Sequence, residues 1–114
     1  MTGTEYQELA MRTSAFHDKK NHIPQDELIH AVCGLASEAG ECTGLVQKIY
    51  QGHTLDHDHL KKELGDALWF IAEACDYLGT TVDDIMQMNI DKLKARYPQG
   101  FEEERSLHRA EGDI

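Results

Sequence analysis

Apolar residues recur at intervals of three and four along four stretches of the chain, which is the period of an α-helix. These stretches are residues 4–16, 25–50, 58–78 and 81–97. In the second stretch the steps alternate between four and three from Leu28 to Ile49, which is typical of a seam that packs along another helix. No stretch shows a convincing strand pattern. The sequence therefore predicts an all-α protein of four helices.

Turn-forming residues separate these predicted helices. A break at residues 21–25, which contains Pro24, follows the first helix. Gly52 follows the second helix, and Gly79 follows the third. Because only residues 53–57 join the second helix to the third, we expect these two helices to be antiparallel neighbours.

Short polar residues mark the predicted helix starts. Thr4 with a glutamine three residues later forms a capping-box pattern at the first helix, and Thr81 opens the fourth helix. Either Asp56 or Asp58 should cap the third helix. After residue 101 the chain is highly charged and shows no useful periodicity. We therefore expect one all-α domain over residues 1–101 and a frayed or disordered tail over residues 102–114.

Length and charge limit the function classes. A chain of 114 residues with 40% hydrophobic content forms one domain with a thin core, so burial against another copy is plausible. Acidic residues outnumber basic ones 21 to 11, so the surface should repel nucleic acid and anionic lipid. No apolar run reaches the roughly 18 residues that a bilayer requires, and the N-terminal segment is polar. The three cysteines form no C-x-x-C pair and suit reduced thiols. We expect a soluble, cytoplasmic protein.

The segment from Ser37 to Gly44, SEAGECTG, is unusual for the interior of a helix. It contains two glycines, each of which costs a helix up to about 1 kcal/mol. It also contains two glutamates three residues apart, which repel each other. Gly40 and Gly44 leave a small surface that would let a neighbouring helix or a ligand approach closely.

Two matched pairs of acidic residues border the helical seams. Glu38 and Glu41 share a face of the second helix, and Glu63 and Asp66 repeat this spacing on the third. An isolated pair of this kind is usually solvated surface charge. If the two helices pack antiparallel, however, all four carboxylates can converge on one groove. At roughly 5 Å and an effective dielectric of about 20 they would repel by about 3 kcal/mol per pair, so the cluster must take up protons or hold cations.

Oxygen ligands favour a hard ion, Mg²⁺ or Mn²⁺, and such an ion recruits substrate phosphates. A phosphorylated ligand needs local cations in so acidic a chain. Along one face of the fourth helix lie Asn89, Lys92 and Arg96, with Tyr97 adjoining, and Lys48 lies beyond the glutamates on the second helix. Taken singly, such lysines and arginines are mostly solvated surface residues.

Two other possible metal sites fit less well. The string with His53, His57 and His59 could bind zinc, but it offers no cysteine and no defined ligand set. Glu27 and His30 match half of a di-iron signature, which requires two such pairs on separate helices. No second pair occurs, so a hard, redox-inert ion at the carboxylates is the better interpretation.

The quoted motifs together resemble those of the MazG-like nucleotide pyrophosphohydrolases, in the all-α NTP pyrophosphatase superfamily. The resemblance rests on E38-A-G-E41, E63-L-G-D66 and N89-I-D-K92-L-K-A-R96-Y97-P-Q-G-F101, and it covers residues 5–101. It implies an antiparallel four-helix bundle-like fold that assembles as a homodimer or a dimer of dimers, with a base pocket built partly from another subunit.

The resemblance also implies an activity and the residues that carry it. A nucleoside triphosphate, usually a deoxynucleotide, would be hydrolysed with Mg²⁺ to the monophosphate and pyrophosphate, as in nucleotide-pool housecleaning. The metal ligands would be Glu38, Glu41, Glu63 and Asp66. The substrate contacts would be Asn89, Lys92, Arg96 and Tyr97, with Lys48 near the phosphates.

Several alternatives stay open at this stage. Either Glu38 or Glu41 could orient the attacking water as general base. The base could be that of dUTP, dCTP, a modified nucleotide or a histidine-pathway phosphoribosyl nucleotide, because the acidic residues contact only phosphates and metal. A non-catalytic helical dimerisation module with a structural divalent ion is the rival from another class.

Overall fold

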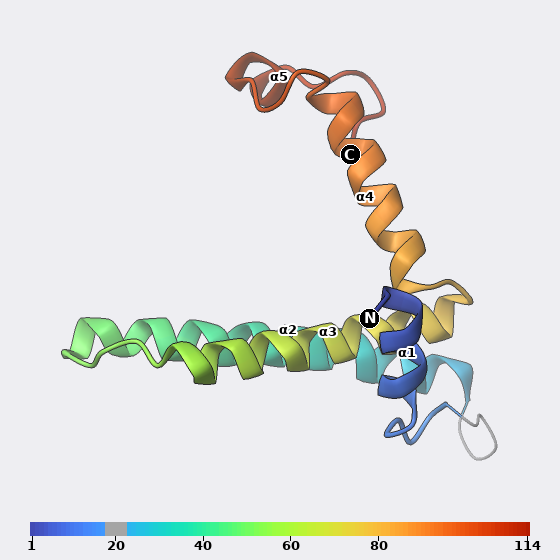
Figure 1. The fold of residues 1–114 in the computed structure, drawn as a ribbon, viewed down its shortest axis with the longest axis vertical. Helices are drawn as coiled ribbons and strands as arrows, with labels where there is room; N and C mark the ends of the chain where they lie inside the picture. The colour runs from blue at the N-terminus through green and yellow to red at the C-terminus, as the bar shows by residue number, and fades with distance from the viewer. Residues whose placement is uncertain (18–22) are drawn as a thin grey trace. The chain divides into compact units, whose positions relative to one another are not determined.

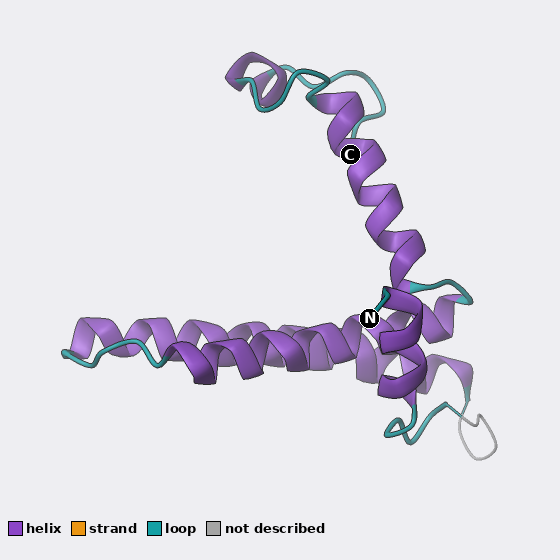
Figure 2. Ribbon diagram, viewed as in Figure 1, coloured by secondary structure: helices purple, strands orange, loops and turns teal. Residues whose placement is uncertain are grey.

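The computed structural model describes residues 1–17 and 23–114, and all of the regular elements in these ranges are helices (Figures 1 and 2). The described part contains no strand beyond an isolated bridge between Pro98 and Gly100. The all-α prediction is therefore confirmed. Residues 21 and 22 of the predicted break lie outside the described residues. The elements are α1 (Gly3–Met11), α2 (Pro24–Gln47), the 3₁₀ helix η1 (Lys48–Gln51), α3 (His57–Leu78), α4 (Val82–Arg96) and α5 (Glu103–Leu107).

The chain divides into two compact units, which are described separately. In the first unit, Met1–Val82, α2 and α3 run side by side and α1 packs on α3 (Figure 1). The second unit, Asp83–Ile114, contains the rest of α4 together with α5. A bundle of four helices and an independent domain over residues 1–101 stay predictions. The structure differs from the expected unstructured tail, since residues 103–107 form α5.

The helix starts follow the predicted capping chemistry, with one correction. The side chain of Asp56 accepts a hydrogen bond of 3.0 Å from the backbone N–H of His59, so Asp56 caps α3 as expected. At α1 the cap is Thr2, whose hydroxyl accepts from the backbone N–H of Glu5 at 3.0 Å. The predicted start at Thr4 was wrong because a second threonine with the same capping ability stands two residues earlier.

Both predicted glycine stops of the α2–α3 pair are confirmed. Gly52 follows η1 with φ of 88°, and Gly79 follows α3 with φ of 67°. Both angles are left-handed, a conformation that only glycine adopts without strain. The short link between the helices makes α2 and α3 antiparallel neighbours, as the sequence predicted. None of the helices in the described ranges has both the length and the apolar character needed to cross a bilayer.

The buried core lies where α1 packs against the C-terminal half of α3. Trp69, the only tryptophan of the chain, donates from Nε1 to the Ala10 carbonyl at 3.0 Å and to the Thr13 hydroxyl at 2.9 Å, which ties the two helices together. Most members of the core are small, so the core is thin, as the composition indicated. The buried apolar residues of this core are Ala10, Met11, Ala72, Cys75 and Val82.

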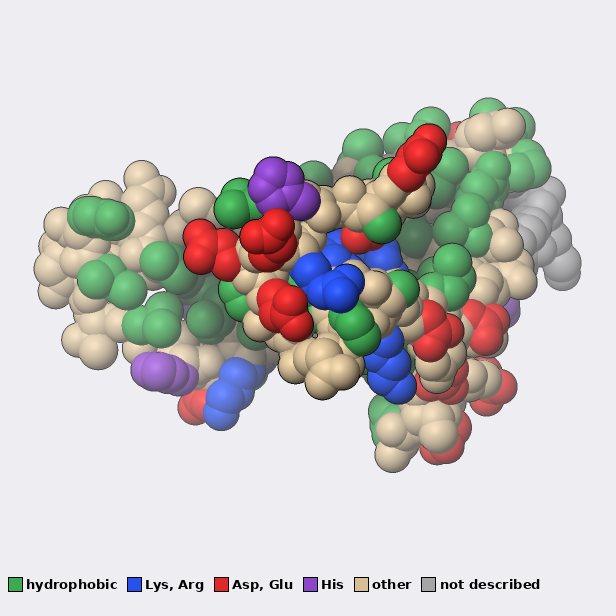
Figure 3. All heavy atoms as spheres, turned by 90° about the horizontal axis from the view of Figure 1, so that it is seen from above, with side chains coloured by type: hydrophobic (Ala, Val, Ile, Leu, Met, Phe, Trp, Pro, Cys, Tyr) green, Lys and Arg blue, Asp and Glu red, His purple; other side chains and the backbone are tan. Residues whose placement is uncertain are grey.

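The seam predicted from Leu28 to Ile49 is only partly covered by α3. Val32 and Val46 are 54% and 46% exposed, and Leu64 on the facing helix is 53% exposed. Figure 3 likewise shows many hydrophobic side chains on the surface in view. Periodicity identifies the apolar face of a helix but not how far a partner covers it.

Small residues instead set how closely α2 and α3 approach. A Cβ atom added at Gly34 would lie 2.1 Å from Cε1 of Phe70, so the Phe70 ring packs directly on the α2 backbone. At Gly40 and Gly44 an added Cβ would meet no described atom within 4 Å. Within this chain, the close approach that we expected at these two glycines therefore occurs at Gly34.

Candidate metal centre

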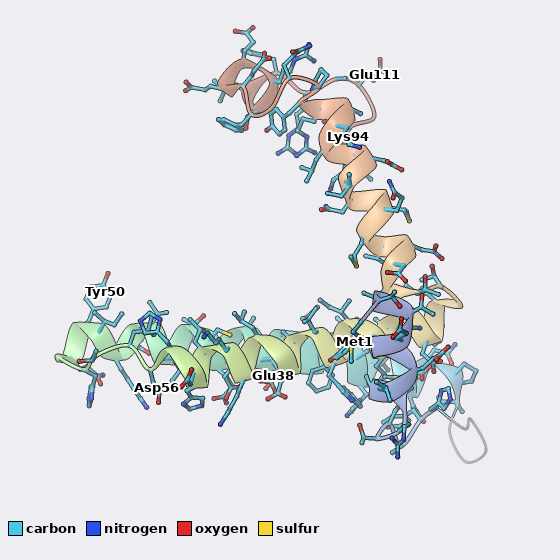
Figure 4. All side chains as sticks on the ribbon, in the orientation of Figure 1. Met1, Glu38, Tyr50, Asp56, Lys94 and Glu111 are labelled. Atoms are coloured by element: carbon cyan, nitrogen blue, oxygen red, sulfur yellow. The ribbon has the colours of Figure 1, made fainter. Side chains whose placement is uncertain are left out.

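Three of the predicted carboxylates come together where α2 and α3 lie side by side. Ligand oxygens of Glu38, Glu63 and Asp66 all lie within 4.8 Å of one another, and we name this group the carboxylate cluster. Figure 4 shows Glu38 partway along the paired helices, away from the turn near Tyr50 and Asp56. The spacing of three residues on α3 places two of the carboxylates on one face, and antiparallel packing brings the third from α2.

The electrostatics of the carboxylate cluster favour a bound cation. The pKa of Glu38 is raised, first because a hydrogen bond to the side chain of Glu63 favours its protonated form. Burial and the negative charges of the surrounding carboxylates raise it further. When both carboxyls are ionised, the buried Oε2 of Glu38 has no hydrogen-bond donor among the described residues. A buried carboxylate oxygen without a donor is costly unless it gains a proton or a cation.

Glu41 lies apart from this group. It is exposed, and although its charge contributes to the raised pKa of Glu38, it is not among the three residues whose oxygens cluster. The structure therefore brings together three of the four predicted carboxylates. Glu41 lines a hollow of about 270 Å³ with Lys48 and His59, so it shares a surface with one predicted phosphate contact.

His59 also belongs to the site, although the sequence did not predict this. Its Nε2 lies 2.9 Å from Oε1 of Glu63, one helical turn further along α3. An imidazole in this position orients the carboxylate. The spacing of four residues between His59 and Glu63 was the available signal. In the described part of the chain, His53 and His57 join no group of three metal-ligating side chains, so the zinc interpretation gains no support.

Tyr6 is a second neighbour that the sequence prediction missed. Its hydroxyl donates to the carbonyl of Gly65 at 3.5 Å, between the two cluster residues of α3. Burial raises the pKa of Tyr6, and the negative charge of Asp66 adds to this effect. No local signal could reveal the contact, because it joins residues 59 positions apart through the packing of α1 on α3.

His30 belongs to a separate polar network around the buried Glu73. The Glu73 carboxylate is fully buried, accepts from the Ser14 hydroxyl at 2.7 Å, and pairs with Nδ1 of His30. The His30 ring also packs at an angle against the rings of Phe16 and Phe70, with centroids 4.9 and 5.5 Å away. This network joins α2 and α3 to the segment after α1, which gives His30 a structural role in place of the di-iron interpretation.

The four residues predicted to contact substrate on the last long helix all belong to the second unit. Asn89 and Lys92 are exposed on α4. Arg96 donates from Nε and Nη2 to the Asp113 carboxylate, at 2.7 Å each, and its guanidinium carbon lies 5.9 Å from the Tyr97 ring centroid.

The chain is similar to a known protein family and to a phage protein. The family described as MazG nucleotide pyrophosphohydrolase domain matches residues 27–101, which include the carboxylate cluster and the α4 residues. The gene 37 protein of Mycobacterium phage L5 is 29% identical over 100 residues, which cover 83% of this chain and 88% of the phage protein. No solved structure matches the chain.

Proposed function

Because the chain belongs to the MazG nucleotide pyrophosphohydrolase family, we propose that it hydrolyses nucleoside triphosphates to monophosphates and pyrophosphate in a reaction that requires Mg²⁺. The observation that carries the proposal is the carboxylate cluster, in which a buried oxygen of Glu38 faces two further carboxylates without a donor. A cation is the chemical complement of this arrangement.

The donor set fits Mg²⁺, with Mn²⁺ as a substitute. Glu38, Glu63 and Asp66 offer only hard carboxylate oxygens, and among the described residues no histidine or thiolate has a ligand atom within 4.8 Å of all three. Three ligands leave coordination positions for phosphate oxygens and water, as is usual for this ion. When bound there, Mg²⁺ supplies a Lewis acid that polarises phosphoryl oxygens and offsets the charge of the leaving pyrophosphate.

We assign the general base to Glu41. This carboxylate stands one helical turn from Glu38 and outside the cluster, and it is exposed to water. It is therefore free to accept the proton of a water molecule that attacks at the bond between the α and β phosphates. Lys48, which lines the same hollow, would neutralise a phosphate nearby. His59 acts as a positioning residue through its contact with Glu63.

The remaining substrate contacts come from α4 and from Tyr97, which directly follows it. We propose that Asn89, Lys92, Arg96 and Tyr97 bind the nucleotide. The positively charged side chains of Lys92 and Arg96 would face its phosphates. Because the chain carries a formal charge of -10, such local cations are needed to hold an anionic substrate. We further propose that the substrate is a deoxynucleotide, that the reaction serves nucleotide-pool housecleaning, and that the protein is cytoplasmic. We also propose that it forms a homodimer or homotetramer, because the exposed apolar side chains of α2 and α3 are suited to contact another copy.

The test is pyrophosphate release from a panel of canonical and modified nucleotides, with Mg²⁺ and with a chelator. Asp66→Asn should lower Mg²⁺-dependent turnover at least about 100-fold, because it removes a ligand charge. Asp58→Asn is the matched control, since it neutralises an 88% exposed carboxylate on the same helix and should leave turnover unchanged. Survival of turnover in Asp66→Asn would contradict the proposal. Stabilisation by Mg²⁺ without turnover of any nucleotide would support the non-catalytic alternative.

A further inference from the structure

Arg96 forms the best-defined ion pair of the second unit. Its Nε donates to Oδ2 of Asp113 and its Nη2 donates to Oδ1, both at 2.7 Å. These two parallel bonds use one edge of the planar guanidinium, the edge formed by Nε and Nη2. The side chains of Arg96 and Asp113 are only 9% and 14% exposed, so the pair is largely shielded from water. The carboxylate reaches Arg96 from 17 residues further along the chain, so the tail folds back onto α4.

The surroundings of this pair are locally cationic. Lys92, Arg105 and His108 line a cavity of about 390 Å³ together with Arg96 and Asp113. The pKa of Asp113 is lowered, first by its hydrogen bond to Arg96 and then by nearby positive charges. The segment after residue 91 contains five of the eleven basic residues of the chain, which are Lys92, Lys94, Arg96, Arg105 and Arg109.

A carboxylate and a phosphate present similar pairs of oxygens to a guanidinium. The two bonds that Arg96 makes to Asp113 are therefore the bonds that it would make to a phosphate group. We propose that Asp113 is an intramolecular competitor, which occupies the anion site of Arg96 until a phosphate group of the substrate displaces it. This inference rests on the proposed function only in that the displacing phosphate belongs to the nucleotide.

Charge explains why a nucleotide can displace the tail. Asp113 brings one negative charge, whereas a triphosphate or pyrophosphate brings several and can engage Arg96 and Lys92 together. Because the tail is tethered, its carboxylate competes at a high effective concentration. The fraction of molecules with a free Arg96 sets the apparent affinity, so the competitor weakens phosphate binding in proportion to its own occupancy.

The experiment measures binding of inorganic pyrophosphate by calorimetry in the presence of a chelator, so it requires neither Mg²⁺ nor turnover. Asp113→Asn should bind pyrophosphate on the order of tenfold more tightly than the unchanged protein, because the charge-assisted pair is lost. Glu111→Gln is the matched control, since it removes one negative charge from the lining of the same cavity. It should change the affinity less than about threefold. Asp113→Glu retains the competing charge, so its affinity for pyrophosphate should be close to that of the unchanged protein.

Equal gains in Asp113→Asn and Glu111→Gln would overturn the proposal, because they would indicate a general charge effect. Unchanged or weaker binding by Asp113→Asn would also overturn it, since the pair would then only hold the tail in place. When Arg96→Gln is already present, adding Asp113→Asn should no longer increase the affinity for pyrophosphate. If no nucleotide is hydrolysed but the specific gain is found, the proposed function is wrong and the competitor role stands. If nucleotides are hydrolysed but the gain is absent, the competitor role is wrong and the proposed function stands.

Discussion

Replacing Gly34 with alanine should destabilise the protein, although the same change at Gly40 or Gly44 should stabilise it. At position 34 the new Cβ would lie 2.1 Å from Cε1 of Phe70, far inside the contact limit of 3.4 Å. The ring would have to retreat by more than about 1 Å. Its centroid lies 5.1 Å from Trp69 and 5.5 Å from His30, so these neighbours would have to move with it.

The magnitude follows from two opposing terms. Overpacking of this kind costs about 1–3 kcal/mol. The gain in helix propensity from glycine to alanine is about 1 kcal/mol at each position, since Gly34, Gly40 and Gly44 all lie inside α2. Outside the adjoining backbone of α2, no described atom lies within 4 Å of a Cβ at the two control positions. The difference in unfolding free energy between Gly34→Ala and either control therefore isolates the packing cost, about 1–3 kcal/mol.

Urea unfolding followed by far-UV circular dichroism measures this difference, with all variants at one protein concentration because self-association would shift the midpoints. Adding Phe70→Ala to Gly34→Ala should recover part of the loss, as a double-mutant cycle for residues in contact requires. If Gly34→Ala is as stable as Gly40→Ala, α2 and α3 do not approach through this contact. The reasoning on helix spacing would then be wrong.

Two further predictions concern the partly buried carboxyl of Glu38 and the fully buried carboxyl of Glu73. Because folding raises the pKa of Glu38 above its ordinary value of 4.5, the native state binds this proton more tightly than the unfolded chain. Without Mg²⁺, the stability of the protein should therefore fall as the pH rises from 4.5 through the raised pKa. The urea midpoint of Glu38→Gln should not show this fall. If the midpoints of the variant and of the unchanged protein depend equally on pH, the pKa of Glu38 is not raised by folding. Glu73→Ala should cost about 2–5 kcal/mol, because it leaves a cavity in place of a fully buried side chain and removes the acceptor of Ser14 and His30, whereas Ser14→Ala should cost about 1–3 kcal/mol. If thermal unfolding shows that Ser14→Ala is less stable than Glu73→Ala, the assignment of Glu73 as the centre of this network is wrong.

The features predicted from the sequence were local ones. Helical periodicity identified the two long helices, and Gly52 and Gly79 marked their ends because left-handed backbone strongly favours glycine. The spacing of Glu63 and Asp66 placed both carboxylates on one helix face without any knowledge of the partner. Each of these inferences depends on the geometry of a single element.

Features that depend on packing between elements could not be predicted from the sequence. The apolar seam of α2 predicted an interface centred on residues such as Val32, but Ala31 is the α2 apolar residue that is fully buried. The close contact falls at Gly34 because the Phe70 ring requires space there. The pair of Arg96 with Asp113 was equally hidden, since the tail has no periodicity that could indicate a partner 17 residues away.

The position of the carboxylate cluster explains why its repulsion can be tolerated. The buried core lies where α1 covers α3, whereas Leu64, between the two cluster residues of α3, and Leu68, just beyond them, are 53% and 47% exposed. Like charges at this point therefore oppose a helix contact that contributes little apolar burial, and the core retains most of the stability. A cation bound by Glu38 from α2 and by Glu63 from α3 would reverse the sign of that interaction. The same weakly packed section of the helix pair that accepts the charge is thus the section that a bound metal would tie together.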